Sequence, residues 1–413
     1  MTMPTTHSAK AHWLLPEGVD SSVKPILIGR ALRAFADGYV AVLLPAYLLA
    51  LGFGQVEVGI LSTATLAGSA LATLAIGTVG HRWRHHRLLL AAALLMAATG
   101  FGFAGLSSFW PLAIVAFVGT LNPSSGDVSV FLPLEQARLA AAVKSEARTA
   151  LFARYTVVGS LCAAVGALAS GIPAWTATQA GISLLDALRA MFVLYGCIGL
   201  VVWMIYRDVA DSGGDAATPP APLGPSRRTV FKLAALFSVD AFAGGLVVNS
   251  LLALWLFDRF GLSLAGAGAF FFWAGLLTTA SQWIAPRVAQ RFGLLNTMVF
   301  THIPANICLI LAALAPGLEL SLALLFVRSA LSQMDVPTRT AYVMAAVTPA
   351  ERAAAASFTS VPRSLASAAS PSLGGALLAA GALSAPLILC GSLKIAYDLA
   401  LLLAFRRHEG HEA

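Results

Sequence analysis

Charged residues are scarce in this chain. Only 11% of its 413 residues are charged and 58% are hydrophobic, whereas a soluble globular domain carries about 25% charged residues. This composition excludes a soluble globular protein. Apolar runs such as residues 88–106 are long enough to cross a bilayer as helices, and they exclude a β-barrel, whose strands are shorter and alternate in polarity. We therefore predict an all-α membrane protein.

Cysteines and enzyme motifs are also few or missing. The four cysteines fall inside predicted helices without paired spacing, which favours apolar packing over disulfides or metal ligands. They are Cys162, Cys197, Cys308 and Cys390. The sequence has no phosphate-binding glycine loop with lysine, no zinc-ligand spacing and no nucleophile elbow. We therefore expect neither an enzyme nor a protein driven directly by ATP, with no cofactor and no metal.

The positive charges are distributed as membrane topology requires. The formal net charge is +7 with 26 Lys and Arg residues. If the N-terminus is inside, only Arg189 and Arg259 lie outside, seven lie within helices and the other 17 are inside. The basic residues are not gathered on one domain, which argues against nucleic acid as a partner. We predict a multi-pass protein of the cell (inner) membrane with both termini cytoplasmic. Residues 1–23 contain no apolar core, so we expect no cleavable signal peptide.

The apolar segments predict twelve transmembrane helices. They cover about 23–51, 56–79, 88–106, 109–137, 149–171, 188–206, 230–256, 264–284, 295–315, 318–345, 354–380 and 383–405. Residues 172–186 are expected to form an outer loop. Residues 207–229 are rich in Asp, Gly and Pro and predict a disordered cytoplasmic linker. The predicted domains are a tail (1–23), a six-helix bundle (24–206), this linker, a second six-helix bundle (230–405) and a tail (406–413).

Rare charged residues recur at nearly constant offsets in the two halves. The matching pairs are Asp37 with Asp240 at 203, Asp127 with Asp335 at 208, and Arg82 with Arg291 and Arg154 with Arg363 at 209. Such repeats predict two pseudo-symmetric bundles of about six helices, an arrangement typical of secondary transporters whose site lies between the repeats.

The short basic loop after the second predicted helix resembles a motif of the major facilitator superfamily. The family pattern is Gly-x-Leu-Ala-Asp-Arg-x-Gly-Arg-Lys, and Gly77, Gly80 and Arg82 fit it, with His81 in place of the Asp. Residues 286–293 repeat the pattern with Gln290 in place of the Asp. The resemblance covers about residues 24–405 and implies a twelve-helix transporter that works by alternating access. It also implies an inner gate near these loops, although the Asp that locks this gate in the family is replaced in both halves.

A polar stripe marks the expected solute route. Arg328, Ser332, Asp335 and Arg339 fall at i, i+4, i+7 and i+11 of a predicted helix, on one face. Charges inside a membrane are costly and usually face a transport pathway. The charged groups in the inner halves of helices have two candidate roles: they form interhelical salt bridges that close one end of the pathway, or they contact the substrate directly. The expected cavity residues are Arg30, Arg33, Asn122, Asp127, Arg328, Asp335 and Arg339, and the expected gate residues are Arg82, Arg154, Arg291 and Arg363.

Two carboxylates are candidates for proton coupling. Asp37 and Asp240 lie near mid-depth, where a desolvated carboxylate can titrate near neutral pH. Arg30, Arg33 and Arg328 could instead bind a carboxylate or phosphate of an anionic solute. The alternative is that Glu135 and backbone carbonyls absorb this surplus charge.

Two further pairs follow from helical spacing. Lys394 and Asp398, at i and i+4, are expected to pair. His302 and Asn306 are likewise expected to form a polar pair.

The sequence thus predicts a secondary active transporter of a small organic solute, most simply a monomer that exports the solute in exchange for protons. The alternative transport hypothesis is proton-coupled uptake of an organic anion. A third hypothesis is a membrane sensor that transports nothing, for which substitution of Asp37 or Asp240 by Asn would leave the cell phenotype intact.

Overall fold

The described part of the chain folds into helices and their connections. The computed structural model describes residues 23–79, 83–124, 129–141, 145–208, 224–348 and 351–405, and no strand occurs within these ranges. The helices are α1 (Lys24–Ala50), α2 (Gln55–Val79), α3 (His85–Gly105), α4 (Phe109–Val118), α5 (Phe131–Ala141), α6 (Ser145–Ala169), α7 (Ile172–Ala180), α8 (Leu184–Arg207), α9 (Arg227–Gly245), α10 (Asn249–Phe260), α11 (Leu264–Phe292), α12 (Leu294–Leu314), α13 (Leu318–Leu331), α14 (Asp335–Ala345), α15 (Arg352–Ala369), α16 (Pro371–Ala379) and α17 (Ala385–Phe405).

The helix lengths agree with the predicted twelve-helix membrane fold. Within the described residues, nine helical stretches are long and apolar enough to cross a membrane, and α4 is a shorter apolar helix. When α4 and α5, α9 and α10, α13 and α14, and α15 and α16 are each joined across their break, and the nine-residue α7 is left out as too short to cross a membrane, the described helices make twelve spans. The all-α membrane fold predicted from composition is therefore confirmed.

One connection differs from the prediction. Residues 172–186 were expected to form an outer loop, but α7 occupies most of this segment. Pro173 lies in its first turn, where the missing N–H costs nothing, and Gly181 ends it with φ of 64°. These two residues supply a favourable start and end for a short helix inside a segment that is otherwise loop-like.

Prolines account for two of the three broken spans in the C-terminal half. Pro337 in the first turn of α14 cannot donate to the carbonyl of Gln333, and its ring clashes with that carbonyl in a continuous helix. The predicted helix 318–345 is therefore interrupted between α13 and α14. Pro371 begins α16 and ends α15 in the same way. The break between α9 and α10 contains no proline and was not predicted.

Large apolar side chains cover the outside of the molecule. Leu403 is 81% exposed, Trp110 74% and Trp283 67%. A soluble protein rarely exposes so many large apolar groups together, whereas lipid covers them at no cost. The exposed surface therefore supports a membrane-embedded protein independently of the helix lengths.

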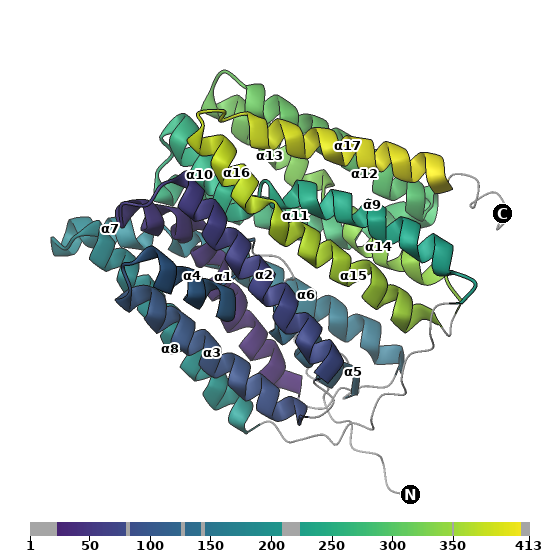
Figure 1. Ribbon diagram of the computed structural model, residues 1–413, viewed down its shortest axis with the longest axis horizontal. Helices are drawn as coiled ribbons and strands as arrows, with labels where there is room; N and C mark the ends of the chain where they lie inside the picture. Colours follow the sequence, from purple (N-terminus) through teal and green to yellow (C-terminus); the bar gives the residue numbers. More distant parts are fainter. Residues whose placement is uncertain are drawn as a thin grey trace, which may run out of the picture.

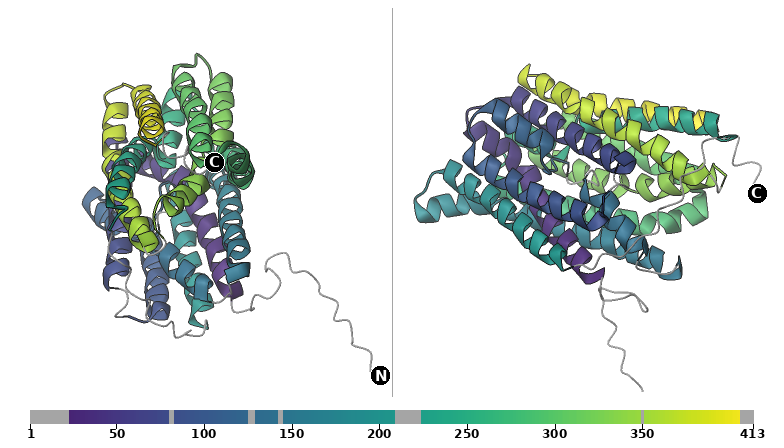
Figure 2. Two further views of the ribbon diagram at one scale, coloured as in Figure 1. Left: turned by 90° about the vertical axis from the view of Figure 1, so that its right-hand side faces the viewer. Right: turned by 60° about the horizontal axis from the view of Figure 1, so that its bottom comes forward.

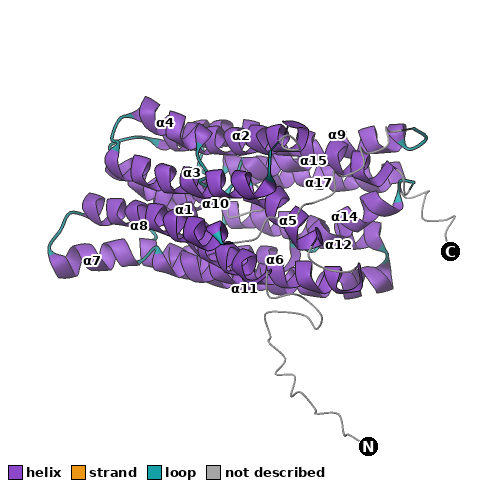
Figure 3. Cartoon of the chain, turned by 90° about the horizontal axis from the view of Figure 1, so that it is seen from below, coloured by secondary structure: helices purple, strands orange, loops and turns teal. Residues whose placement is uncertain are grey.

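The helices run roughly parallel to one another along the long axis (Figure 3). In Figure 1 and the left view of Figure 2, α1 to α8 lie in the lower part, and α9 and α12 to α17 lie in the upper part. Within the lower part α1 packs on α6 and α8, and α3 packs on α8. Within the upper part α9 packs on α15 and α17, and α12 packs on α13, α14 and α17.

Hydrogen bonds join the two parts near the start of α2. Thr63 Oγ1 lies 2.7 Å from Ser372 Oγ of α16, and Ser62 Oγ lies 3.1 Å from Ser250 Oγ of α10. A side chain at Gly59 would overlap the backbone of α16, so glycine permits close approach of the two helices here. We call this region, formed by the first turns of α2 with α10 and α16, the packed end.

Candidate functional site

A cavity of about 100 Å³ lies among α9, α12, α13, α14, α15 and α17. Four cationic side chains and two carboxylates line it, together with His302, Asn306, Ser332 and Gln333. The charged residues are Arg328, Arg339, Arg363, Lys394, Asp240 and Asp335. We call it the cationic cavity. A second hollow of about 340 Å³ beside α14 has no charged residue in its lining, so we do not place the site there.

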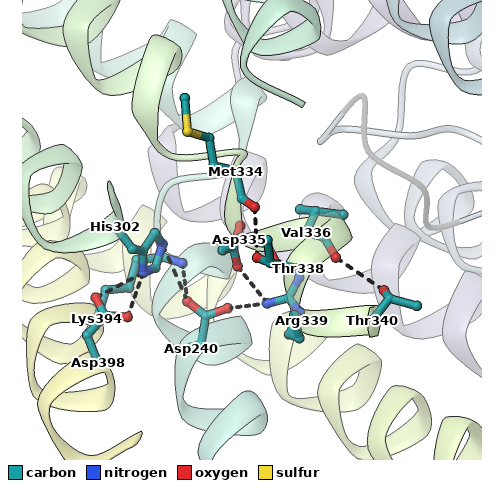
Figure 4. A network of polar contacts seen from close by, with 10 residues as sticks. All are labelled: Asp240, His302, Met334, Asp335, Val336, Thr338, Arg339, Thr340, Lys394 and Asp398. Carbon is teal, nitrogen blue, oxygen red and sulfur yellow. Dashed lines mark hydrogen bonds and ion pairs between the residues drawn. The ribbon is translucent and has the colours of Figure 1, made fainter. Parts of the chain in front are cut away.

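Asp240 of α9 is the centre of the ion pairs in the cationic cavity. Lys394 Nζ of α17 lies 2.5 Å from Oδ1, and Arg339 Nη1 of α14 lies 3.2 Å from Oδ2. His302 Nε2 of α12 lies 4.0 Å from Oδ1. Figure 4 shows the carboxylate between these three side chains. Asp240 is only 3% exposed, so one carboxylate links α9 to three other helices through charges that solvent ions screen weakly.

The partner predicted for Lys394 is wrong. The i, i+4 spacing predicted a pair with Asp398 on the same helix, but Lys394 reaches Asp240. Asp398 instead binds His302, whose Nδ1 lies 3.0 Å from both carboxylate oxygens. Asn306 donates to the backbone carbonyl of His302 at 2.9 Å and not to its ring. Lys394 and Asp398 thus each bind a residue on a neighbouring helix and not each other.

The predicted polar stripe does face one cavity, although its helix is broken. Arg328, Ser332, Asp335 and Arg339 all line the cationic cavity, with Ser332 at the end of α13 and Asp335 at the start of α14. Arg339 Nη1 lies 3.0 Å from Asp335 Oδ2, and its guanidinium lies 5.6 Å from the ring centroid of Phe237. Arg339 is thus held between two carboxylates and an aromatic face.

Arg328 and Arg363 differ from the other two cations. Each has a buried Nε without a hydrogen-bond partner in the structure. Among the described residues neither forms an ion pair, whereas Arg339 and Lys394 do. The surplus positive charge of the cavity therefore lies on Arg328 and Arg363.

A second buried ion pair lies among the helices of the N-terminal half. Arg33 of α1 pairs with Glu135 of α5, and its guanidinium lies 3.8 Å from the ring centroid of Phe131. Tyr155 donates to Glu135 Oε2 at 2.5 Å, and Tyr206 donates to Oε1. Glu135 is fully buried. For Arg33 the structure therefore favours the alternative in which Glu135 absorbs the charge.

The three arginines predicted to bind an anion together have different neighbours in the structure. Arg33 binds Glu135, Arg30 stacks 5.0 Å above the Tyr155 ring, and Arg328 lines the cationic cavity. Arg30 and Arg33 belong to α1 and Arg328 to α13. A shared site for all three remains a prediction, while Arg328 alone faces the cavity described above.

Asp37 lies midway along α1 and is partly buried. The charges of Arg33 and Arg30 act on its carboxylate, and the Tyr195 hydroxyl of α8 lies within hydrogen-bonding range. The backbone of α6 crosses directly beside Asp37, because a side chain at Gly38 would overlap the carbonyl of Ala163. Asp37 thus lies where α1 meets α6 and α8, and its role in proton coupling stays a prediction.

The remaining predicted site residues occupy varied places. Asn122 is buried in the break between α4 and α5, where its Oδ1 accepts from the Ser124 amide and hydroxyl at 3.1 and 2.8 Å. Arg154 of α6 has a buried Nη1 that forms no hydrogen bond within the described residues. Arg291 is exposed at the end of α11 and lies over its neighbour Phe292.

Two predicted residues cannot be placed. Arg82, a predicted gate residue, and Asp127, a predicted cavity residue, lie outside the described residues. The inner-loop motif and the Asp127 counterpart of Asp335 therefore stay predictions.

Comparisons with known proteins agree with this architecture. The family description Major Facilitator Superfamily matches residues 26–332. An uncharacterized membrane protein of Saccharomyces cerevisiae, YJR124C, is 24% identical over 410 residues and covers 91% of this chain and 92% of its own.

Solved structures show the same fold at low identity. The D-xylose-proton symporter superimposes with a TM-score of 0.71 at 16% identity, covering 92% of this chain and 97% of its own. The nucleoside transporter NupG superimposes with a TM-score of 0.70 at 14% identity, covering 94% and 100%. These likenesses concern the fold alone.

Proposed function

This chain belongs to the major facilitator superfamily, and from that premise we propose that it is a proton-coupled secondary transporter of a small organic solute. We propose further that it works by alternating access between two six-helix bundles, residues 24–206 and 230–405, joined by the segment 207–229. Export in exchange for protons is the first form of the proposal. Its setting is the cell (inner) membrane, with both termini cytoplasmic and the protein acting as a monomer.

The observation that carries the proposal is the pair Asp37 and Asp240. They stand 203 residues apart in α1 and α9, and each lies beside arginines within a helix bundle. Asp240 also holds Lys394, so a proton on Asp240 would weaken the contacts of α9 with α14 and α17 at once. A carboxylate that exchanges a cationic partner for a proton is a physical means of coupling proton movement to helix movement.

A second candidate is proton-coupled uptake of an organic anion. The surplus positive charge of the cationic cavity favours it. Fold likeness to a symporter and a nucleoside transporter does not separate the two candidates, since relatives of one fold move different solutes in different directions.

Transport by reconstituted protein tests both candidates. Proteoliposomes are given an imposed pH gradient of either sign, and the uptake of solutes identified by a ligand screen is followed. Export by antiport predicts solute movement against the proton flow, and symport predicts movement with it. Asp37→Asn is expected to lower gradient-driven accumulation at least tenfold, while Asp186→Asn, whose carboxylate is 61% exposed, leaves it unchanged. Accumulation by Asp37→Asn at the wild-type level would contradict the coupling role.

A further inference from the structure

The cationic cavity carries more positive charge than its own carboxylates neutralise. Four cationic side chains line it against two carboxylates, which leaves a formal excess of two positive charges. His302, which also lines the cavity, lies 3.0 Å from Asp398 and 4.0 Å from Asp240. Most buried charges in proteins are paired, because an isolated one loses its hydration without recompense. The excess therefore needs an explanation from outside the cavity walls.

The excess can be assigned to two residues that line the cavity from different helices. Arg339 and Lys394 are paired with carboxylates. Arg328 of α13 and Arg363 of α15 have buried Nε atoms without partners, and within the described ranges no carboxylate pairs with either. Both line the same cavity. Two guanidiniums from separate helices thus line one small space whose own carboxylates, Asp240 and Asp335, are paired with Arg339 and Lys394.

We propose that Arg328 and Arg363 bind a phosphate monoester head group on the transported solute. This inference rests on the proposed function, since it assumes that the cavity belongs to the solute route. A phosphate monoester carries about −1.5 to −2 charges at pH 7, which matches the excess of two. Each guanidinium presents paired N–H donors that fit two oxygens of one phosphate. A monocarboxylate would neutralise only half of the excess.

The size of the cavity limits what it holds. A volume of about 100 Å³ is a few times the roughly 30 Å³ that one water occupies in the liquid, so it accommodates a head group and not a whole nucleotide or sugar. Ser332 and Gln333, in the break between α13 and α14, add a hydroxyl and an amide to the wall. The organic part of the solute must therefore lie outside the cavity.

Binding is measured on purified protein by thermal shift, with glycerol 3-phosphate as the probe. Glycerol and sodium chloride at matched ionic strength are the control ligands. The proposal predicts saturable stabilisation by glycerol 3-phosphate and none by glycerol or by chloride. Equal stabilisation by chloride would overturn it, and so would stabilisation by succinate without any by glycerol 3-phosphate.

Variants assign the binding to the two arginines. Arg328→Gln and Arg363→Gln are each expected to weaken the apparent Kd at least tenfold, and each is expected to keep the melting temperature of the ligand-free protein, because each arginine is half-buried and forms no ion pair within the described residues. Arg259→Gln makes the same charge change at an exposed arginine and is expected to leave the Kd unchanged. Wild-type binding by either cavity variant would overturn the proposal.

Phosphate binding by Arg328 can be tested even if Arg328→Gln does not fold. Should Arg328→Gln yield no folded protein, Arg328→Lys replaces it, since lysine keeps the charge but lacks the paired donors. The proposal then requires at least threefold weaker binding by Arg328→Lys, and unchanged binding overturns it.

The inference and the proposed function fail separately. Phosphate monoester binding in a protein that moves no solute in proteoliposomes would refute transport and keep the head-group site. Gradient-driven transport of a neutral solute that is insensitive to Arg328→Gln would refute the head-group site and keep transport.

Discussion

Removal of the Asp240 carboxylate tests the ion-pair network most sharply. In Asp240→Asn, Lys394 loses the charge of its partner at 2.5 Å, whereas Arg339 keeps Asp335 at 3.0 Å. Removing one partner of a buried pair costs about 3–5 kcal/mol. The Asn side-chain oxygen still accepts one hydrogen bond from a charged donor, which returns about 1.5 kcal/mol. We expect a net loss of about 2–3 kcal/mol in the free energy of unfolding.

A second substitution is expected to offset most of this loss of stability. Lys394→Met in the Asp240→Asn background removes the orphaned cation, and replacing a buried pair by apolar side chains is often neutral. The double variant is therefore expected to be about 2 kcal/mol more stable than Asp240→Asn alone.

The assay is reversible unfolding of the purified protein in mixed micelles with increasing sodium dodecyl sulfate, followed by circular dichroism. Asp186→Asn, which changes an exposed carboxylate, serves as the control and is expected to shift stability by less than about 0.5 kcal/mol. Strictly additive effects of Asp240→Asn and Lys394→Met, or wild-type stability of Asp240→Asn, would refute the network argument.

Three further predictions concern other parts of the fold. Glu135→Gln leaves the buried Arg33 without its carboxylate and is expected to lower the free energy of unfolding by about 3 kcal/mol in the same assay. The control Glu319→Gln, at an exposed position, is expected to lower it by less than about 0.5 kcal/mol. Equal effects of the two substitutions would contradict the buried pair. Hydrogen bonds from a threonine, a serine and a backbone amide lower the pKa of Glu351 from its ordinary 4.5 to about 2. Because this pKa is depressed, the contribution of the carboxylate to stability is present above about pH 4.5 and is lost as pH falls through about 2. The melting-temperature difference between wild type and Glu351→Gln should therefore be constant above that range and shrink on acidification, and a constant difference down to pH 2 would contradict it. Alternating access requires the packed end to open, so a cross-link there is expected to block transport. Thr63 and Ser372, whose hydroxyls lie 2.7 Å apart, are replaced by cysteines in a background without the native cysteines; oxidation is expected to cross-link them and slow transport at least tenfold, and reduction is expected to restore it. Undiminished transport by the cross-linked protein would contradict the opening of the packed end.

Much of the fold could be predicted from the sequence because long apolar runs and rare repeated charges are local signals. The break between α4 and α5 follows from Pro123 and nearby glycine, which the sequence displays. The break between α9 and α10 could not be predicted in this way. It follows Gly245, where a side chain would overlap Ser370 and the Ser367 carbonyl of α15, so the constraint lies in a neighbouring helix.

The site was predictable only in part, for a similar reason. The stripe from Arg328 to Arg339 could be found because charges are rare and their helical spacing is visible. The partners could not, since Lys394 has Asp398 at i+4 yet binds Asp240 across the bundle. Interhelical distances decide such competition, and one sequence does not contain them. Helical spacing predicted Lys394 as the partner of Asp398 and Asn306 as the partner of His302, so the contact between Asp398 and His302 was not predicted.

The most direct test of the account is proton movement that depends on the solute. Proteoliposomes loaded with a pH-sensitive dye are exposed to each solute that stabilises the purified protein, without an imposed gradient. The account predicts that a transported solute changes the internal pH with wild-type protein and with Asp186→Asn, and that Asp37→Asn abolishes this change. Solute entry without any change in internal pH would contradict proton coupling, and the absence of entry for every stabilising solute would contradict transport itself.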